Sequence, residues 1–235
     1  MLSIIHRSPD LVAINKPHGL LVHRSPIASD ASEFAVQLLR DQLGQRVYPV
    51  HRLDRKTSGV LLFALTEAMN TAMQQQFMEG KVHKTYLAIV RGYTPDAQII
   101  DYPLRRDEGR NAGTMQEAVT HLKTLQHTEI PLPHGKHQTS RYSLVELAPE
   151  TGRMHQLRKH MAHILHPIIG DRPHGCNKQN KLFLDHFGMN TMLLHAQRLV
   201  FPHPVSGEQV AISAPIQSEF DRTMGALFTP VDPRI

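Results

Sequence analysis

The surroundings of Asp54 point to chemistry more directly than any other feature of this chain. Asp54 lies in the stretch His51-Arg52-Leu53-Asp54-Arg55-Lys56-Thr57-Ser58-Gly59, among three cations and just before the apolar residues 60–65. Nearby positive charge favours the ionised form of a carboxylic acid, and an ionised carboxylate can act as a nucleophile. The stretch therefore predicts an ionised Asp54 that meets a polyanionic substrate.

Hydrogen-bond donors are concentrated in a second stretch, Thr151-Gly152-Arg153-Met154-His155-Gln156-Leu157-Arg158, where a helix is expected to begin. Arg158 is able to hold Asp54 by a bidentate hydrogen bond, which would orient the carboxylate and keep it deprotonated. A plain Asp–Arg ion pair that joins two elements has the same residues and spacing. The spacing alone leaves both interpretations open.

Tyr86 follows Lys84-Thr85 in a predicted strand. Most strand tyrosines are amphipathic core residues. A ring on a strand also stacks well on an extruded base. Both uses of Tyr86 stay open at this point.

Several other kinds of site are disfavoured. The chain has no GxxxxGK(S/T) and no GxGxxG after a strand, so we expect no nucleotide cofactor. It also has no Gly-x-Ser-x-Gly elbow, which argues against a serine hydrolase. His160, His163 and His166 recur every third residue without a Cys, carboxylate or HExxH partner, so we expect no metal.

The charge balance favours a phosphate-rich partner. Lys and Arg number 26 against 21 Asp and Glu in 235 residues, a formal net charge of +5. Arg105, Arg106 and Arg110 fall in residues 101–116, which we expect to be an exposed basic loop that contacts phosphates and orders on binding.

The sequence also bears on location and assembly. It shows no signal peptide and no apolar run near the roughly 20 residues of a membrane span, so we expect a cytoplasmic protein without membrane contact. The single Cys176 rules out an intramolecular disulfide. No heptad seam or Trp patch is present, which favours a monomer.

Strand and helix patterns mix without strict βαβ alternation, which predicts an α+β fold with a mixed, mainly antiparallel sheet flanked by helices and loops. We expect a single domain over residues 1–235 with no S4-like domain at its N-terminus. The expected strands are residues 11–16, 19–23, 60–65, 84–92, 118–125, 142–147 and a hairpin over 199–214. The expected helices are residues 32–43, 67–79 and 155–165.

The ordered motifs resemble one family nearly from end to end. The stretch around Asp54 resembles the catalytic signature of the RluA-type pseudouridine synthases. Further matches are Asn15-Lys16-Pro17-His18-Gly19, Lys84-Thr85-Tyr86, Thr151 to Arg158, His166-Pro167-Ile168-Ile169-Gly170-Asp171, and the closing segment with His195-Ala196, His203-Pro204 and Gly207-Glu208. Within that family the chain is most similar to the subgroup that acts on tRNA.

The resemblance implies the pseudouridine synthase catalytic fold and the cofactor-free isomerisation of a uridine in RNA to pseudouridine. Asp54 would be the nucleophile, and whether it attacks the sugar, attacks the base or removes a sugar proton is left open. Tyr86 would stack on the uracil, Arg158 would pair with Asp54, and Arg52, with His51 in the same region, would fill the gap left by the flipped uridine. The implied substrate is a tRNA uridine near the junction of acceptor stem and T-arm, at position 65, with ribosomal RNA as the second candidate.

Two rival interpretations come from other classes of protein. A noncatalytic RNA-binding module explains the basic charge but not an acid within the basic stretch around Asp54. A carboxylate-dependent glycosidase or N-glycosylase needs a second acid as proton donor, and the sequence offers none beside Asp54 or in residues 151–158.

Overall fold

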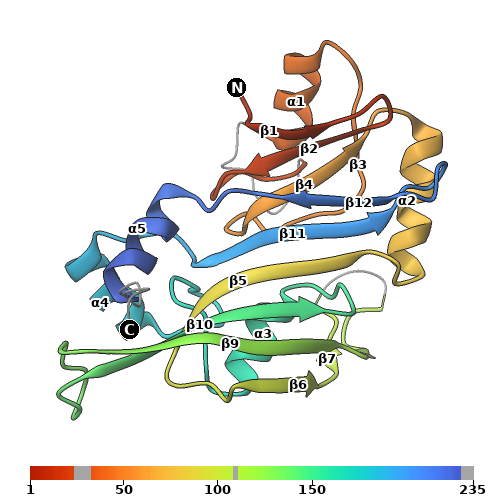
Figure 1. Ribbon diagram of the computed structural model, residues 1–235. Helices are drawn as coiled ribbons and strands as arrows, with labels where there is room; N and C mark the ends of the chain where they lie inside the picture. Colours follow the sequence, from red (N-terminus) through yellow and green to blue (C-terminus); the bar gives the residue numbers. More distant parts are fainter. Residues whose placement is uncertain (24–32, 108–110, 229–235) are drawn as a thin grey trace, which may run out of the picture. The chain divides into compact units, whose positions relative to one another are not determined.

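The computed structural model describes residues 1–23, 33–107 and 111–228 (Figure 1). The chain divides into two compact units, which we call unit 1 (residues 1–85 and 195–216) and unit 2 (residues 86–194 and 217–235). The division falls within strand β5 (His83–Arg91). Within the described ranges, no helix has the length and apolar character needed to cross a membrane.

The strands of unit 1 pair in the order β1-β2-β4-β11-β12, and β3 pairs with the end of β4. All of these pairs are antiparallel except β4 with β11, which is parallel. Every residue of β4 is buried, as expected of a central strand whose sequence is a continuous apolar run. The strands are β1 (Ile4–Arg7), β2 (Leu11–Lys16), β3 (Tyr48–Pro49), β4 (Ser58–Ala64), β11 (Leu194–Pro202) and β12 (Gln209–Ser213).

Two helices belong to unit 1, α1 (Ala35–Leu43) and α2 (Glu67–Met78). The Thr66 hydroxyl caps α2 by accepting the N–H of Met69 at 3.2 Å. Met69 and Met73 are buried in one apolar cluster with residues of β2, β4 and β11, so these methionines of α2 serve core packing.

The strands of unit 2 pair in the order β5-β10-β9-β6, all antiparallel. They are β5, β6 (Ala97–Asp101), β9 (Val119–Ile130) and β10 (Ser140–Pro149). The strand predicted over 118–125 is shorter than the observed strand β9, which ends at Ile130. β9 extends further because it stays paired with β10 beyond those of its residues that face the core.

The described residues of unit 2 also form three helices, α3 (Gln156–His163), α4 (Asn177–Phe187) and α5 (Ser218–Leu227). Leu157 and Met161 of α3 are buried in a cluster with Val145 and Leu147 of β10. In Figure 1, α3 lies against the sheet formed by β9 and β10. This packing fixes the helix that carries Arg158.

The prediction of a loop without secondary structure over 101–116 is wrong in its described part. β7 (Leu104–Arg105) pairs with β8 (Met115–Gln116), and the N–H of Arg106 donates to the carbonyl of Thr114 at 2.9 Å. Leu104 is buried, so one apolar side chain anchors a segment that is otherwise rich in Arg, Asp and Gly. The composition of the segment therefore does not predict this hairpin.

The predicted fold class is confirmed. The described residues form an α+β architecture of mainly antiparallel strands, with one parallel pair, and five helices. The short extended piece expected over 19–23 forms no regular strand, because Leu21 makes only an isolated bridge to Phe34.

Candidate active site

Asp54 lies in unit 1 on the short connection between β3 and β4. Its carbonyl accepts the N–H of Thr57 at 3.1 Å and closes a turn. Asp54 itself is half-buried, whereas Thr57, Ser58 and Gly59 are buried. The carboxylate therefore stands on a tight turn whose far end is fixed in the core.

The Lys16 side chain supports this turn from inside the unit. Lys16 is fully buried, and its Nζ donates to the carbonyls of Pro17, Leu20 and Arg55 at 2.9, 2.8 and 3.2 Å. Burial lowers the pKa of Lys16 to about 7, while the nearby charge of Asp54 raises it. Sequence reasoning gave Lys16 no role, and the one available signal was its place in the Asn-Lys-Pro stretch.

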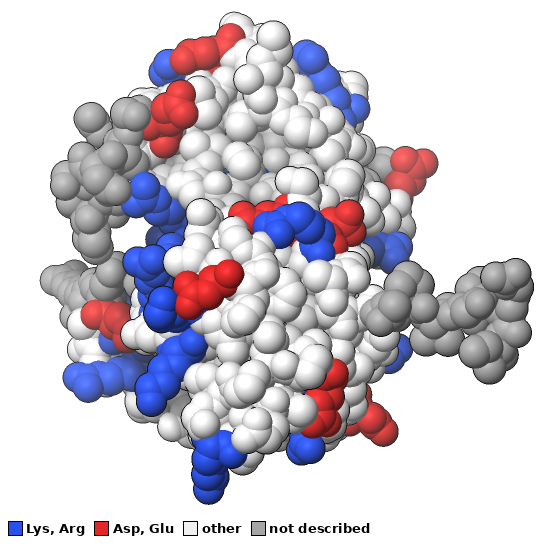
Figure 2. All heavy atoms as spheres, turned by 90° about the vertical axis from the view of Figure 1, so that its left-hand side faces the viewer, with Lys and Arg blue, Asp and Glu red and all other residues white. Residues whose placement is uncertain are grey.

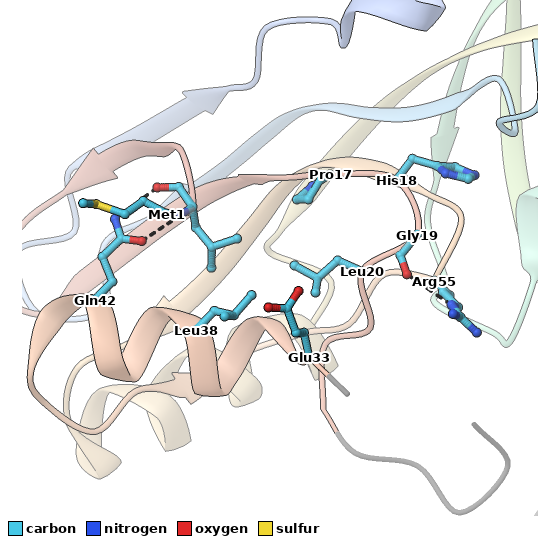
Figure 3. Close-up of a pocket in the computed structure, with 10 residues that line it drawn as sticks. Met1, Pro17, His18, Gly19, Leu20, Glu33, Leu38, Gln42 and Arg55 are labelled. Atoms are coloured by element: carbon cyan, nitrogen blue, oxygen red, sulfur yellow. Dashed lines mark hydrogen bonds between the residues drawn. The ribbon is translucent and has the colours of Figure 1, made fainter. Parts of the chain in front are cut away.

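The segment 17–20 is also tied directly to Arg55. The N–H of Gly19 donates to the Arg55 carbonyl at 2.9 Å, and Arg55 Nε donates to the Gly19 carbonyl at 3.1 Å. A pocket of about 700 Å³ borders this contact, and Figure 3 shows Glu33 and Leu38 among the side chains that line it. The surface beside the Asp54 turn is thus hollowed and lined by both polar and apolar groups.

His51 fastens the start of the turn. Its ring stacks on Phe77 with centroids 5.2 Å apart, and its Nε2 accepts the N–H of Leu62 at 3.1 Å. Burial, together with the charge of Lys84, lowers the pKa of His51 to about 4, against a smaller raising effect from the Arg52 backbone. The imidazole is therefore neutral at pH 7 and positions the turn, while the predicted RNA contact of His51 stays a prediction.

The end of the turn is fastened to β11. His195 Nε2 lies 3.2 Å from the Ala214 carbonyl, so this nitrogen donates and Nδ1 accepts from the Ser58 hydroxyl at 2.8 Å. Burial lowers the pKa of His195, in keeping with this neutral form. Gly59 has φ 108, and a Cβ there would lie 2.1 Å from the Ala196 carbonyl oxygen, so only glycine fits.

Tyr86 and Arg158 belong to unit 2. Tyr86 lies on β5 opposite Leu147 of β10, half-buried against the apolar cluster that also contains α3 side chains. Arg158 is buried, and its Nε and Nη2 donate to the two carboxylate oxygens of Asp171 at 2.7 and 2.9 Å. The predicted pairing of Arg158 with Asp54 stays a prediction.

Asn180 of α4 holds the backbone next to Asp171. Its Oδ1 accepts the N–H of Gly170 at 2.8 Å, and its Nδ2 donates to the Asp171 carbonyl at 2.7 Å. A Cβ at Gly170 would lie 1.9 Å from the Thr191 carbonyl oxygen, so the segment also passes close to another backbone. Sequence reasoning missed both residues: Asp171 ended a recognised motif without a role, and no signal marked Asn180.

The three regularly spaced histidines make contacts of different kinds. His160 donates from Nε2 to the Tyr102 carbonyl at 3.0 Å, and its Nδ1 lies 3.0 Å from Thr120 Oγ1. His163 stacks on Tyr102, and His166 donates from Nδ1 to the Arg91 carbonyl at 2.9 Å. Throughout the described ranges, no three His, Cys, Asp or Glu side chains are grouped so that they could hold a metal ion.

The predicted RNA-contacting arginines are accessible where they are described. Arg52, Arg105 and Arg106 are exposed, and Arg110 lies outside the described residues. Figure 2 shows exposed Lys and Arg side chains on the face that it draws, with some Asp and Glu among them. Such a surface suits contacts to a phosphate backbone.

Curated relatives match the chain over nearly its whole length. A tRNA pseudouridine synthase C from Haemophilus influenzae is 46% identical over 231 residues, covering 95% of this chain and 97% of the relative. The protein of the same name from Haemophilus ducreyi is 48% identical over 225 residues, covering 93% of each chain.

Solved structures agree with these sequence matches. The human RNA pseudouridylate synthase domain containing 4 has a TM-score of 0.74 at 26% identity, covering 97% of this chain and 95% of that one. The human RNA pseudouridylate synthase domain containing 1 has a TM-score of 0.71 at 27% identity, covering 99% and 97%.

A model of the RNA pseudouridylate synthase family matches residues 10–163, which include Asp54, Tyr86 and Arg158. The resemblance predicted from the ordered motifs is thereby confirmed. This chain belongs to the RNA pseudouridylate synthase family, and its members are RNA pseudouridine synthases.

Proposed function

We propose that this chain isomerises a uridine of tRNA to pseudouridine, at position 65 near the junction of acceptor stem and T-arm. The observation that carries the chemistry is the half-buried carboxylate of Asp54, held on a fixed turn beside the buried Lys16 ammonium. The choice of tRNA is supported by relatives that are 46–48% identical and bear the name tRNA pseudouridine synthase C.

The reaction balances within the substrate. The bond from uracil N1 to ribose C1′ breaks, the base turns, and a bond from C5 to C1′ forms. C5 then loses its proton and N1 gains one, so no atom or electron is exchanged with a second reactant. An enzyme for this reaction has to hold the base while it turns and to supply a nucleophile and a proton acceptor.

Asp54 is the nucleophile in this proposal. Three steps are open to its carboxylate: attack on the sugar, attack on the base, and removal of a sugar proton. Tyr86 stacks on the uracil and removes the C5 proton after the new bond has formed. Its half-buried place on β5 suits a ring that keeps one part in the core and presents another part to a ligand.

Arg158 orients the Asp54 carboxylate. Asp171 occupies the Nε and Nη2 groups of Arg158, and a guanidinium carries five N–H donors in all. The bidentate pair fixes the plane of the guanidinium, so the remaining donors have a defined direction. The proposed role of Arg158 therefore depends on Asp171.

The remaining proposed contacts bind RNA. A paired or stacked uridine must be extruded at a cost of a few kcal/mol, and the exposed Arg52 fills the gap that it leaves, with His51 in the same region. Arg105, Arg106 and Arg110 contact phosphates and position the RNA without reading its sequence. We also propose that the enzyme is a cytoplasmic monomer with a single catalytic domain.

Release of tritium from C5-labelled uridine tests the proposed substrate. The wild-type protein is incubated with a labelled tRNA transcript, the same transcript with U65 replaced by C, and labelled ribosomal RNA transcripts. Release from the tRNA that the U65 replacement abolishes is the expected result. Release from ribosomal RNA alone would contradict the tRNA assignment, and tight binding without release from any RNA would favour a noncatalytic RNA-binding module.

A further inference from the structure

Tyr102 and His163 form an exposed ring stack in unit 2 that the proposed chemistry does not use. Their ring centroids lie 3.6 Å apart with an interplanar angle of 16°. Tyr102 follows the end of β6, and His163 is the last residue of α3. Tyr102 keeps 40% of its surface exposed and His163 is also exposed, so the pair does not lie in the core.

The backbone beneath this stack is fixed on both sides. The N–H of Tyr102 donates to the Ala118 carbonyl at 3.2 Å, and the Tyr102 carbonyl accepts from the buried His160 at 3.0 Å. Since His160 comes from α3, the same helix holds the Tyr102 backbone and supplies the second ring. The stack is therefore a preorganised surface rather than a pair of side chains without a fixed position.

Cationic groups lie next to the stack along α3. His163 and Lys159 are four residues apart and share one face of the helix. Lys159 Nζ donates to Asp107 Oδ2 at 2.6 Å and to the Arg105 carbonyl at 3.4 Å. The segment that follows Tyr102 and contains β7 therefore lies along α3. The exposed side chains of Arg105 and Arg106 extend from this segment.

The combination fits RNA better than it fits another partner. Proteins that bind unpaired bases use exposed aromatic rings for stacking, beside Lys and Arg that contact the phosphates. Arg158 lies on the same helix five residues before His163, which corresponds to about 7.5 Å along the helix axis. The stack is thus on the same helix as Arg158, the residue proposed to orient Asp54, and within the length of a few nucleotides from it.

On the basis of the proposed function, we infer that Tyr102 and His163 form a stacking surface for an unpaired base of the substrate RNA, separate from the reacting uridine. The surface contributes to RNA affinity and not to the chemical step. The hairpin cations contact the flanking phosphates, and the two rings receive a neighbouring base.

The test compares RNA affinity in proteins that carry Asp54→Asn, so that turnover does not enter the measurement. The added substitutions are Tyr102→Leu, which removes the ring, and Tyr102→Phe, which keeps it. The probes are a tRNA transcript and a blunt, fully paired RNA duplex, each followed by fluorescence anisotropy. Hydrogen exchange at the Tyr102, Arg106 and Gly113 amides reports whether the hairpin stays folded.

Loss of one base–aromatic stack predicts about 5- to 150-fold weaker tRNA binding by Tyr102→Leu, equivalent to roughly 1–3 kcal/mol. Tyr102→Phe should bind within about twofold of the parent, and duplex binding should not change. Because stacking releases no counterions, the slope of log Kd against log salt should also stay constant. His163→Leu should weaken tRNA binding in the same direction with hairpin exchange unchanged.

Unchanged tRNA affinity in Tyr102→Leu would overturn the inference. Equal losses of tRNA affinity in Tyr102→Leu and Tyr102→Phe would also overturn it, as would a loss of duplex affinity in Tyr102→Leu equal to its loss of tRNA affinity. Weakening that appears only where hairpin exchange accelerates would also overturn it, since the pair would then merely fasten the hairpin. Failure of the proposed function is seen separately, as a wild-type protein that releases no tritium from tRNA.

Discussion

Arg158 and Asp171 form a bidentate ion pair inside unit 2, with donor–acceptor distances of 2.7 and 2.9 Å and side chains only 6% and 1% exposed. Both charged groups are removed from water, so each depends on the other for compensation. The pair joins α3 to the segment that precedes α4. It is the contact through which the fold sets the direction of the Arg158 guanidinium.

Removal of the Asp171 carboxylate should therefore destabilise the protein strongly. Asp171→Ala takes the bidentate carboxylate partner away from a buried guanidinium, at an expected cost of about 3–5 kcal/mol in the free energy of unfolding. Urea titration followed by circular dichroism measures this. The control is Asp185→Ala in the exposed Lys181–Asp185 pair, which should change stability by less than about 0.5 kcal/mol. Similar losses in both variants would contradict the importance of the buried pair.

Asn180 should act on the reaction through the same pair. Asn180→Ala removes two hydrogen bonds to the backbone of residues 170–171, so Asp171 and the Arg158 guanidinium are held less firmly in position. We expect kcat to fall by about 10²-fold while KM for RNA changes little, since small misplacements at a reacting centre have effects of this size. Steady-state kinetics on the tRNA transcript measures both constants.

The matched control for that substitution is Asn177→Ala, at an exposed position on the same helix. It should leave kcat and KM unchanged. A rise in KM without a fall in kcat for Asn180→Ala would show that Asn180 serves RNA binding and not the position of Arg158.

His51 should make stability fall as the solution becomes more acidic. Its pKa is lowered in the folded protein to about 4, against an ordinary value of 6.5, so between these values the unfolded chain binds the additional proton. The contribution of His51 to the free energy of unfolding is fully present above pH 6.5. It falls as the pH is lowered towards 4, by no more than about 1.4 kcal/mol per pH unit.

The comparison for this pH effect is His51→Gln, which keeps a hydrogen-bond acceptor but does not titrate. The difference in unfolding free energy between wild type and His51→Gln, measured in urea at pH 7.5, 6 and 5, should shrink as the pH falls. A difference that is constant over this range would show that burial and the charge of Lys84 do not hold His51 neutral.

Gly59 should tolerate no side chain. Gly59→Ala combines a φ of 108 with a Cβ only 2.1 Å from the Ala196 carbonyl oxygen, so the β4–β11 pairing has to shift. Overpacking of this kind costs about 1–3 kcal/mol before the backbone strain is added. Gly225→Ala is the control, because nothing lies within 4 Å of its Cβ position in α5, and it should leave the melting temperature unchanged or raise it. Equal melting temperatures for both variants would contradict the close approach at Gly59.

The sequence predicted those elements whose hydrophobic pattern is local. The apolar run that forms β4 and the Met69–Met73 spacing of α2 each carry enough information in one short window. The hairpin at Leu104 was missed because a single buried side chain, and not a periodic pattern, holds it in place. α4 and α5 were likewise not predicted.

The proposed catalytic residues of the candidate site were predictable from the sequence, whereas the contacts that support them were not. Asp54, Tyr86 and Arg158 stand in recognisable motifs, so their selection needed no coordinates. The supporting contacts of Lys16, Asp171 and Asn180 join residues that are distant in sequence or bind backbone atoms, and no residue pattern encodes such contacts. Sequence thus indicated the residues proposed to react, and the structure supplied contacts that position them.

The most direct measurement is tritium release from C5-labelled tRNA by wild type, Asp54→Asn and, as a control, Asp41→Asn on exposed α1. The account predicts that Asp54→Asn lowers the single-turnover rate by more than about 10³-fold, while its tRNA affinity is equal or tighter, because a negative charge has been removed. Asp41→Asn should match wild type. Turnover by Asp54→Asn within about tenfold of the wild-type rate, with the U65 requirement intact, would contradict the claim that Asp54 is the nucleophile.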